Sequence, residues 1–351
     1  MNRLLKTALT VVLVAAMASC SNKQEGANPS AGAAGGGIQI TGAGSTFVNP
    51  LMTKWSAEYA AANPNIHINY QAIGSGAGIQ QVTTGTVDFG ATDGPMTDEQ
   101  LSGSKVGRIL HVPVIMGATV AAYNLPGFTG ELKLTPNLLA NIFLGKITKW
   151  NDRAIAKVNP GSNLPATNIL VTHRSDGSGT TYIWTDYLSK VSPEWKTKVG
   201  NNTSVDWPAG VGAKGNDGVA GMIRQTPGAL GYIEMTYADQ NNIPYASIQN
   251  AAGKFIRPTA EAVAAAASSG QIPDDFRFSL TNAPGPDAYP IGGTTWVLLP
   301  VQSKDKARGA ALLAFVRWVL GPGQQYAPAL HYAALPASLV TRVEQTLGQV
   351  Q

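Results

Sequence analysis

The chain has 351 residues, room for two ordinary domains, and 44% of them are hydrophobic, which predicts a globular protein. Lys and Arg number 25 against 21 Asp and Glu, and they are scattered, so the sequence lacks the basic stripe of nucleic-acid-binding proteins. The single cysteine excludes an intramolecular disulfide and a multi-cysteine metal cluster. We therefore expect no nucleic-acid partner, no metal and no cofactor.

Residues 1–19 are typical of an export signal, because two basic residues precede an apolar run that is too short to span a bilayer. The sequence Met17-Ala18-Ser19-Cys20 resembles the lipobox of bacterial lipoproteins, in which the cysteine is acylated and holds the protein at a membrane surface. Ordinary cleavage after Ala18, which leaves an unmodified thiol, is the alternative. Residues 20–37 are rich in Gly, Ala, Ser and Asn and predict a flexible, lipid-anchored tether.

From Ile38 onward, predicted strands alternate with predicted helices. Leu51, Trp55 and Tyr59 recur every four residues, as on one face of a helix, and residues 65–70 alternate as in a half-buried strand. The later elements are predicted strands at 87–89, 168–172 and 294–299 and predicted helices at 180–190 and 304–320. Such alternation is typical of an α/β fold with mostly parallel strands, and a chain of this length is expected to form two lobes.

Three times, a predicted strand runs into a short loop rich in Gly, Ser and Thr and then into a helix, at residues 40–47, 73–78 and 173–181. Glycine lets the backbone approach a ligand closely, and the unpaired N–H groups and dipole at a helix start attract an anion. Ser and Thr are also good helix caps, so capping explains any one loop taken alone better than a binding site does. The three loops together predict an anion site.

Two charged residues accompany these loops. Arg174, in the third loop, has a planar guanidinium that suits phosphate or carboxylate, and an ion pair with Asp176 is the alternative. Asp93 follows the predicted strand 87–89 in a Gly-Pro turn, where it is either a turn residue or a ligand contact. Both residues are therefore candidates for the anion site.

These segments, in this order, resemble the periplasmic phosphate-binding protein of the ATP-binding-cassette phosphate uptake system. The resemblance runs from about Ile38 to the C-terminal helices and includes residues 144–150, 214–218 and 227–232. It implies the α/β, two-lobed periplasmic-binding-protein fold of type II, with the ligand in the cleft between the lobes. Lobe 1 would hold residues 38–116 and 287–351, and lobe 2 would hold residues 117–286.

The resemblance also implies which residues contact the phosphate ion: Thr46, Phe47, Ser75, Asp93, Arg174, Ser178, Gly179 and Thr180. Thr46 and Phe47 would bind largely through main-chain amides, and Asp176 matches the acidic neighbour that pairs with the arginine. Ser45 stands where the family often has Ala. The implied partners are inorganic phosphate, an inner-membrane permease and its ATPase, and the implied protein is a periplasmic monomer.

A carboxylate at a phosphate site is understandable if phosphate binds with a proton still attached. Asp93 would accept the hydrogen bond of that proton, whereas sulfate is fully ionised at neutral pH and would be rejected. Two alternatives remain open. One is a receptor for another oxyanion such as sulfate or molybdate, which needs no acid in the site, and the other is a phosphate-sensing surface lipoprotein.

An enzyme is not expected. The sequence contains no G-x-S-x-G, H-E-x-x-H or P-loop motif, and its four histidines are widely separated. Residues 210–215 fit G-x-G-x-x-G, but residues 205–209 before them make a poor strand, so a dinucleotide site is not predicted. The expected function is therefore high-affinity phosphate binding outside the inner membrane and delivery to a permease.

Overall fold

The computed structural model describes residues 37–268 and 270–350. The predicted export signal (residues 1–19), Cys20 and all of the predicted tether except its last residue lie outside the described residues. The described strands are β1 (Ile38–Gly44), β2 (Ile66–Gln71), β3 (Phe89–Thr92), β4 (Ile109–Tyr123), β5 (Lys133–Leu134), β6 (Leu170–Arg174), β7 (Val211–Ala213), β8 (Ala229–Glu234), β9 (Ser247–Gln249), β10 (Phe255–Ile256) and β11 (Gly292–Pro300).

The described α-helices are α1 (Asn49–Ala62), α2 (Ser75–Thr84), α3 (Asp98–Ser102), α4 (Pro136–Phe143), α5 (Arg153–Val158), α6 (Gly179–Val191), α7 (Pro193–Lys198), α8 (Gly215–Gln225), α9 (Met235–Gln240), α10 (Ala260–Ala267), α11 (Lys306–Leu320) and α12 (Ala337–Leu347). Two short 3₁₀ helices, η1 (Pro322–Tyr326) and η2 (Pro328–Leu330), precede α12. Within the described part of the chain, no helix has the length and apolar character needed to cross a membrane.

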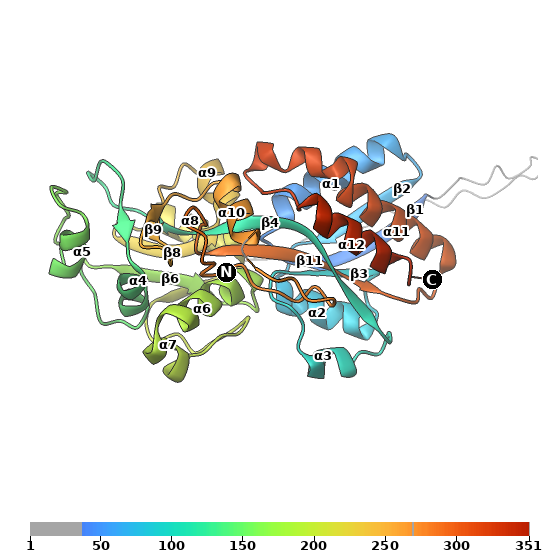
Figure 1. The fold of residues 1–351 in the computed structure, drawn as a ribbon, viewed down its shortest axis with the longest axis horizontal. Helices are drawn as coiled ribbons and strands as arrows, with labels where there is room; N and C mark the ends of the chain where they lie inside the picture. Colours follow the sequence, from blue (N-terminus) through green and yellow to red (C-terminus); the bar gives the residue numbers. More distant parts are fainter. Residues whose placement is uncertain (1–36, 269, 351) are drawn as a thin grey trace, which may run out of the picture. The chain divides into compact units, whose positions relative to one another are not determined.

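One long strand joins the two halves of the main sheet. In the described residues that sheet has the order β2-β1-β3-β11-β4-β8-β6-β7, and a small second sheet has the order β10-β9-β5. All side chains of β4 are buried, because its sequence is almost wholly apolar or small. β11 pairs with β4 from Ile109 to Ala118, and β8 pairs with it from Thr119 to Tyr123, so β4 runs through both halves (Figure 1).

The pairing of β4 with β11 contains a bulge that matters for the site. Thr295 faces Ile115 but Trp296 faces Pro113, which leaves Val114 without a partner in the ladder. Pro113 has no N–H to donate, so a break in the ladder is expected beside it. Bulges re-aim side chains, and here the hydroxyl of Thr295 reaches the carboxylate of a neighbouring loop.

The sheet is less parallel than predicted. β1 is parallel to β2 and β3, and β6 is parallel to β7 and β8. However, β11 is antiparallel to β3 and β4, and β4 is antiparallel to β8. The two long strands enter the sheet in the opposite direction because the chain crosses between its halves along them.

The predicted elements exist, but two strand boundaries were wrong. β3 begins at Phe89 rather than Val87, because the Asp88 carboxylate accepts the N–H and hydroxyl of Thr41 at 2.7 and 2.9 Å. β6 is displaced from the predicted residues 168–172 to Leu170–Arg174. β2, β11, α6 and α11 agree closely with the prediction, as does the buried face of α1.

Helices cover both faces of the main sheet (Figure 1). α1 and α11 pack over the β1 and β2 region, and α2 packs on β1 and β3 from the other face. Between α2 and the sheet lies a small apolar cluster that includes Ile79 and Val82. In the other half of the sheet, α6 and α8 pack near β6 and β8. α6 starts shortly after the end of β6, and α8 starts shortly after the end of β7.

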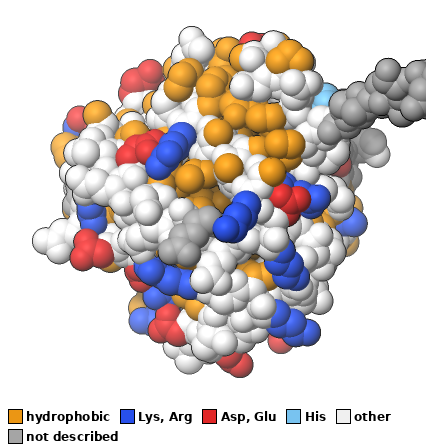
Figure 2. Space-filling model, turned by 90° about the vertical axis from the view of Figure 1, so that its right-hand side faces the viewer, with side chains coloured by type: hydrophobic (Ala, Val, Ile, Leu, Met, Phe, Trp, Pro, Cys, Tyr) orange, Lys and Arg blue, Asp and Glu red, His pale blue; other side chains and the backbone are white. Residues whose placement is uncertain are grey.

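The surface charge is dispersed on the face shown in Figure 2. Lys and Arg side chains there lie singly or beside acidic side chains, and apolar side chains gather above them. The formal net charge of the whole chain is +4. This face therefore has no continuous basic stripe of the kind that binds nucleic acid.

Candidate functional site

All three predicted glycine-rich loops join a strand to the start of a helix. β1 leads through residues 45–48 into α1, β2 leads into α2, and β6 leads into α6. A fourth loop of this kind joins β7 to α8. It lies in residues 214–218, which carry part of the resemblance but were not predicted to form an anion loop. In the third loop Ser178 Oγ accepts the N–H of Thr181 at 3.1 Å, whereas the residues directly before α1, α2 and α8 provide no side-chain cap. The first N–H groups of α8 instead donate to side chains of other loops, to Asp176 Oδ1 at 3.1 Å and to Thr46 Oγ1 at 3.3 Å. Capping by the preceding residue therefore accounts for the third loop alone.

The loops before α2 and α6 touch each other through glycine. The N–H of Gly76 donates to the main-chain oxygen of Gly177 at 3.0 Å. A Cβ added to Gly179 would lie 2.4 Å from Asp93 Oδ2 and 2.5 Å from Ser75 Oγ. Because real Cβ atoms do not approach oxygen so closely, a side chain at Gly179 would push these loops apart.

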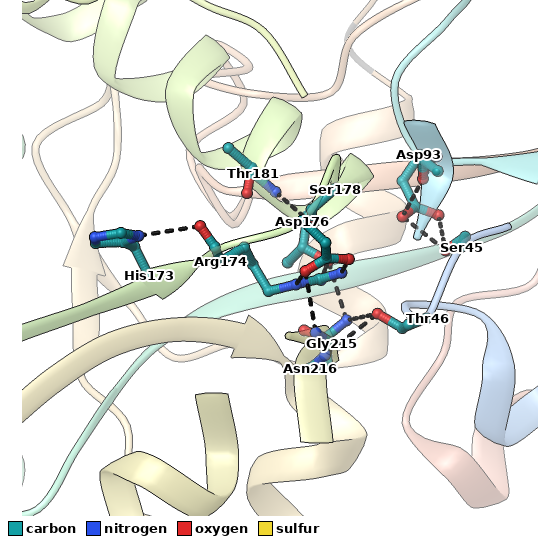
Figure 3. A network of polar contacts seen from close by, with 12 residues as sticks. Ser45, Thr46, Asp93, His173, Arg174, Asp176, Ser178, Thr181, Gly215 and Asn216 are labelled. Atoms are coloured by element: carbon teal, nitrogen blue, oxygen red, sulfur yellow. Dashed lines mark hydrogen bonds and ion pairs between the residues drawn. The ribbon is translucent and has the colours of Figure 1, made fainter. Parts of the chain in front are cut away.

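Arg174 ends β6 and is buried, with 3% of its surface exposed. Its Nε and Nη2 donate to the two carboxylate oxygens of Asp176 at 2.8 and 2.5 Å, so the expected ion pair is present and bidentate (Figure 3). Burial raises the pKa of Asp176, but the hydrogen bonds and charge of Arg174 outweigh it and hold this pKa below its ordinary value. The remaining guanidinium nitrogen, Nη1, lies 3.4 Å from Thr180 Oγ1.

Asp93 follows β3 and is also buried, with 2% of its surface exposed. Its carboxylate accepts hydrogen bonds from the hydroxyls of Ser45 at 2.6 and 2.7 Å, Thr295 at 2.7 Å and Ser75 at 3.5 Å. Burial raises the pKa of Asp93 to about 6, although these hydrogen bonds and the charge of Arg174 act to lower it. Asp93 is therefore a buried acceptor held by hydroxyl groups.

A side chain from the fourth loop connects two of the other loops. Asn216 Nδ2 donates to Thr46 Oγ1 at 2.8 Å and to Thr180 Oγ1 at 3.1 Å, and Figure 3 shows Asn216 directed at Thr46. Asn216 Oδ1 accepts the N–H of Glu234 at 3.0 Å, which fixes the orientation of the amide. The four loops thus meet in one network of buried polar groups.

Several main-chain N–H groups in this network have no hydrogen-bond acceptor within the described part of the chain. They belong to four buried residues: Thr46, Phe47, Gly179 and Thr180. Buried N–H groups are nearly always paired, so these groups mark a place for a ligand with acceptor atoms. Together with an arginine and several hydroxyls, they suit an anion that carries several oxygens.

Every residue predicted to contact the ion is buried and lies in one of these loops or at the end of β3. The ring of Phe47 packs against Tyr332 in the core, which leaves its main chain for the site. Asn216 and Thr295 were missed. Asn216 follows a short strand and a glycine, the same pattern as the predicted loops, whereas nothing in the sequence of β11 distinguishes Thr295.

The described residues favour neither a dinucleotide site nor a metal site. Residues 210–215 do not form a dinucleotide-binding turn, because β7 lies inside them and residues 205–209 form no strand, as predicted. Within the described residues, no group of three or more His, Cys, Asp or Glu could hold a metal ion. The anion site is therefore the candidate that the geometry supports.

The sequence matches the PBP superfamily domain over residues 27–322. The phosphate-binding protein PstS of Xylella fastidiosa (strain Temecula1) is 49% identical over 310 residues, which cover 88% of this chain and 84% of that protein.

Two solved structures are similar in fold. A high affinity periplasmic phosphate-binding protein bound with phosphate has a TM-score of 0.69 at 21% identity, and the alignment covers 88% of this chain and 93% of that one. An ABC-type phosphate transport receptor from Vibrio cholerae has a TM-score of 0.56 at 18% identity, and the alignment covers 85% of this chain and 100% of that one. These likenesses confirm the two-lobed periplasmic-binding-protein fold. The sequence identity over most of both chains shows that this protein belongs to the PstS family of phosphate-binding proteins within the PBP superfamily, a family of solute-binding proteins rather than enzymes.

Proposed function

We propose that this protein binds inorganic phosphate in the cleft between its two lobes and delivers it to an inner-membrane ATP-binding-cassette permease and its ATPase. One observation carries the proposal: the buried acid Asp93 lies in the same group of loops as four buried main-chain N–H groups that have no acceptor among the described residues. The names of its relatives, phosphate-binding proteins and a phosphate transport receptor, support the same ligand. The contacts are those expected from the sequence: Thr46, Phe47, Ser75, Asp93, Arg174, Ser178, Gly179 and Thr180, with Asp176 behind Arg174.

Asp93 gives the site its selectivity in this proposal. The main-chain amides, the hydroxyls and Arg174 attract any tetrahedral oxyanion. A protonated phosphate oxygen donates to the Asp93 carboxylate, whereas sulfate would set a bare oxygen against it. An unpaired buried acceptor costs about 1–3 kcal/mol, which is roughly a ten- to hundredfold loss of affinity. The protein therefore accepts phosphate and rejects sulfate.

The lobes are proposed as predicted, with residues 38–116 and 287–351 in lobe 1 and residues 117–286 in lobe 2. The exchange of pairing partners along β4, from β11 to β8 between Ala118 and Thr119, supports a boundary there. Contacts between these lobes extend past the site, since Arg277 pairs with Asp98 at 2.7 Å. Closure of lobe 2 on lobe 1 would bring Arg174 and Asn216 to the anion held by lobe 1.

The cellular setting completes the proposal. Residues 1–19 direct export to the periplasm, and acylated Cys20 anchors a monomeric binding domain through the tether of residues 20–37. The word periplasmic in the name of one structural relative supports this location. The closed, phosphate-loaded form would then dock on the permease.

The test is a calorimetric titration of the domain from Ile38 onward with phosphate, sulfate and molybdate. We expect wild-type protein to bind phosphate and not sulfate, and Asp93→Asn to gain sulfate binding while losing little phosphate affinity. Asp287→Asn is the matched control, because it removes the same charge from a side chain that is 77% exposed. A wild-type protein that prefers sulfate or molybdate, or binds none of the three, would overturn the proposal.

A further inference from the structure

Three tyrosines hold three consecutive carbonyls of the first anion loop. The hydroxyl of Tyr70 donates to the main-chain oxygen of Ser45 at 2.7 Å. The hydroxyl of Tyr237 donates to that of Thr46, and the hydroxyl of Tyr332 to that of Phe47, both at 2.6 Å.

These tyrosines come from separate parts of the chain. Tyr70 lies in β2, Tyr237 in α9, and Tyr332 after η2. Three separate elements are thus folded around one loop, and each supplies a phenol to it. A repeated arrangement of this kind demands a reason beyond filling the core, because Phe would fill the same space without a hydroxyl.

The geometry of the peptide bond supplies that reason. A peptide unit is planar, and in the trans form its C=O and N–H point in opposite directions. The described part of the chain contains no cis peptide bond. The Ser45 carbonyl belongs to the same unit as the N–H of Thr46, and the Thr46 carbonyl to the same unit as the N–H of Phe47. A tyrosine that holds one of these carbonyls therefore aims the next residue's N–H to the opposite side.

The three peptide units differ in where their N–H groups go. The N–H groups of Thr46 and Phe47 have no acceptor among the described residues, although 4% and 0% of these residues' surface is exposed. The N–H of Val48 donates within the loop, to Ser45 Oγ at 3.3 Å. The units held by Tyr70 and Tyr237 thus present free donors, and the unit held by Tyr332 closes the turn.

We propose that Tyr70 and Tyr237 are positioning residues for the bound oxyanion: each orients one peptide unit so that the amide of Thr46 or Phe47 donates to it. Tyr332 holds the same loop but aims no amide at the ligand. This inference rests on the proposed function, since it assumes that the loop binds phosphate. Its physical basis is preorganisation, because donors held in place before binding need no reorganisation when the anion arrives.

Besides the hydroxyl of Tyr237, the carbonyl of Thr46 has one weaker hydrogen-bond donor. The Thr46 oxygen also accepts the N–H of Asn49, at 3.3 Å, a longer bond than the 2.6 Å bond from Tyr237. Removal of the phenol therefore leaves that peptide unit held at one distant point and free to tilt. No second protein donor to the Ser45 carbonyl is present in the described residues, so removal of the Tyr70 hydroxyl leaves that unit without a partner.

The experiment uses ¹⁵N-labelled protein and the variants Tyr70→Phe, Tyr237→Phe and Tyr332→Phe, each titrated with inorganic phosphate. In wild type we expect phosphate to move the amide proton signals of Thr46 and Phe47 downfield. Tyr70→Phe should reduce the shift at Thr46 and spare Phe47, and Tyr237→Phe should do the reverse. Loss of one such hydrogen bond predicts about a three- to tenfold weaker affinity in either variant. Tyr332→Phe should leave both phosphate-induced shifts in place.

Tyr245→Phe is the general control, because the hydroxyl of Tyr245 donates to Asp239 at 3.0 Å and not to the loop. Equal loss of both shifts in all three loop variants would show a role in packing alone and overturn the inference. Unchanged shifts and affinity in Tyr70→Phe and Tyr237→Phe would overturn it as well. A wild-type protein that fails to bind phosphate would instead contradict the proposed function.

Wild-type protein offers a readout that needs no substitution. Scalar coupling between phosphorus and an amide nitrogen is measurable across a hydrogen bond, so it should appear at Thr46 and at Phe47 if the amides of these residues donate to the ion. Absence of coupling at both nitrogens in phosphate-saturated protein would overturn the inference even if a variant failed to fold.

Discussion

Asn216 Nδ2 and Thr46 Oγ1 lie 2.8 Å apart, and the Asn216 main-chain N–H is also directed at this oxygen, at 3.3 Å. Both lone pairs of the Thr46 hydroxyl are then occupied by donors, so its hydrogen must point elsewhere. Thr180 Oγ1 likewise accepts from Asn216 Nδ2 and from Arg174 Nη1. The two hydroxyls are thereby left free to donate to the anion of the proposed site, in contrast to Ser45 and Thr295, whose hydrogens are directed to Asp93.

Asn216→Asp is expected to weaken phosphate binding more than Asn216→Ala does. The introduced carboxylate would accept the hydroxyl hydrogens of Thr46 and Thr180 and turn them away from the ion, whereas alanine leaves them free. We expect about a tenfold loss in the alanine variant, as for one hydrogen bond, and a larger loss in the aspartate variant. Calorimetric titration measures both.

Asn250→Ala is the matched control for this pair. Asn250 is 4% exposed and binds the main chain of residues 285–288, so its loss should lower the melting temperature and leave phosphate affinity unchanged. If the isosteric aspartate variant binds phosphate better than the alanine variant, hydroxyl orientation is not the function of Asn216.

Gly179→Ala should abolish most phosphate binding while the protein stays folded. The added Cβ would lie 2.4 Å from Asp93 Oδ2, so the loops before α2 and α6 must separate. Overpacking of this kind destabilises a folded protein by about 1–3 kcal/mol. If displacement of the donors costs a similar amount of binding free energy, phosphate affinity falls by up to roughly a hundredfold. Gly221→Ala is the control within α8, because a Cβ there meets nothing within 4 Å. It should bind phosphate normally and melt slightly higher; equal affinity in both variants would contradict the prediction.

The contribution of Asp93 to the stability of the ligand-free protein should be smaller at neutral pH than at pH 4. Burial raises the pKa of Asp93 from its ordinary value of 3.8 to about 6. Between these values the folded protein binds a proton that the unfolded chain does not, so stability from this group falls as pH rises towards 6. This shift of the Asp93 pKa corresponds to a loss of about 3 kcal/mol in the free energy of unfolding between the two pH limits.

Asp93→Asn removes this charge, so the variant should gain stability relative to wild type at pH 8 and lose most of that gain at pH 4. Urea unfolding at both pH values measures the difference. Other groups titrate equally in the two proteins and cancel. A variant that is equally stabilised or destabilised at both pH values would show that the carboxylate is not strained by burial.

Selectivity should follow the same ionisation. In the proposed site, the Asp93 carboxylate above pH 6 would accept a hydrogen bond from phosphate and reject sulfate. Below pH 6 the protonated acid would be a donor, which sulfate can use. The ratio of sulfate to phosphate dissociation constants should therefore fall by up to about tenfold for each pH unit as the pH is lowered from 8 towards 6, and level off below 6. Competition titrations at pH 8, 7, 6 and 5 would detect this fall, and a constant ratio would contradict it.

Much of the fold was accessible from the sequence, because local patterns encode the strands, loops and helix starts. The list of contact residues came from the resemblance to a known family. The spacing of Leu51, Trp55 and Tyr59 marks a helix face wherever that helix packs. Strand, glycine-rich loop and helix start follow one another within about ten residues, and helix-start donors arise from local geometry. The strand bounds near Asp88 were wrong because the hydrogen bonds of its carboxylate to Thr41, a residue distant in the sequence, and not local propensity, decide where β3 begins.

The sequence by itself thus determined that three glycine-rich loops join strands to helix starts, that Arg174 and Asp176 lie in the third loop, and that Asp93 follows another strand in a turn. Only the tertiary structure decided how those groups face one another. Asn216 and Thr46 are 170 positions apart, and Thr295 and Asp93 are 202 apart, so their contacts depend on strand order and on the course of β4 through the sheet. The same holds for the three tyrosines, since a phenol donates only to the carbonyl that the fold places within about 3 Å of it.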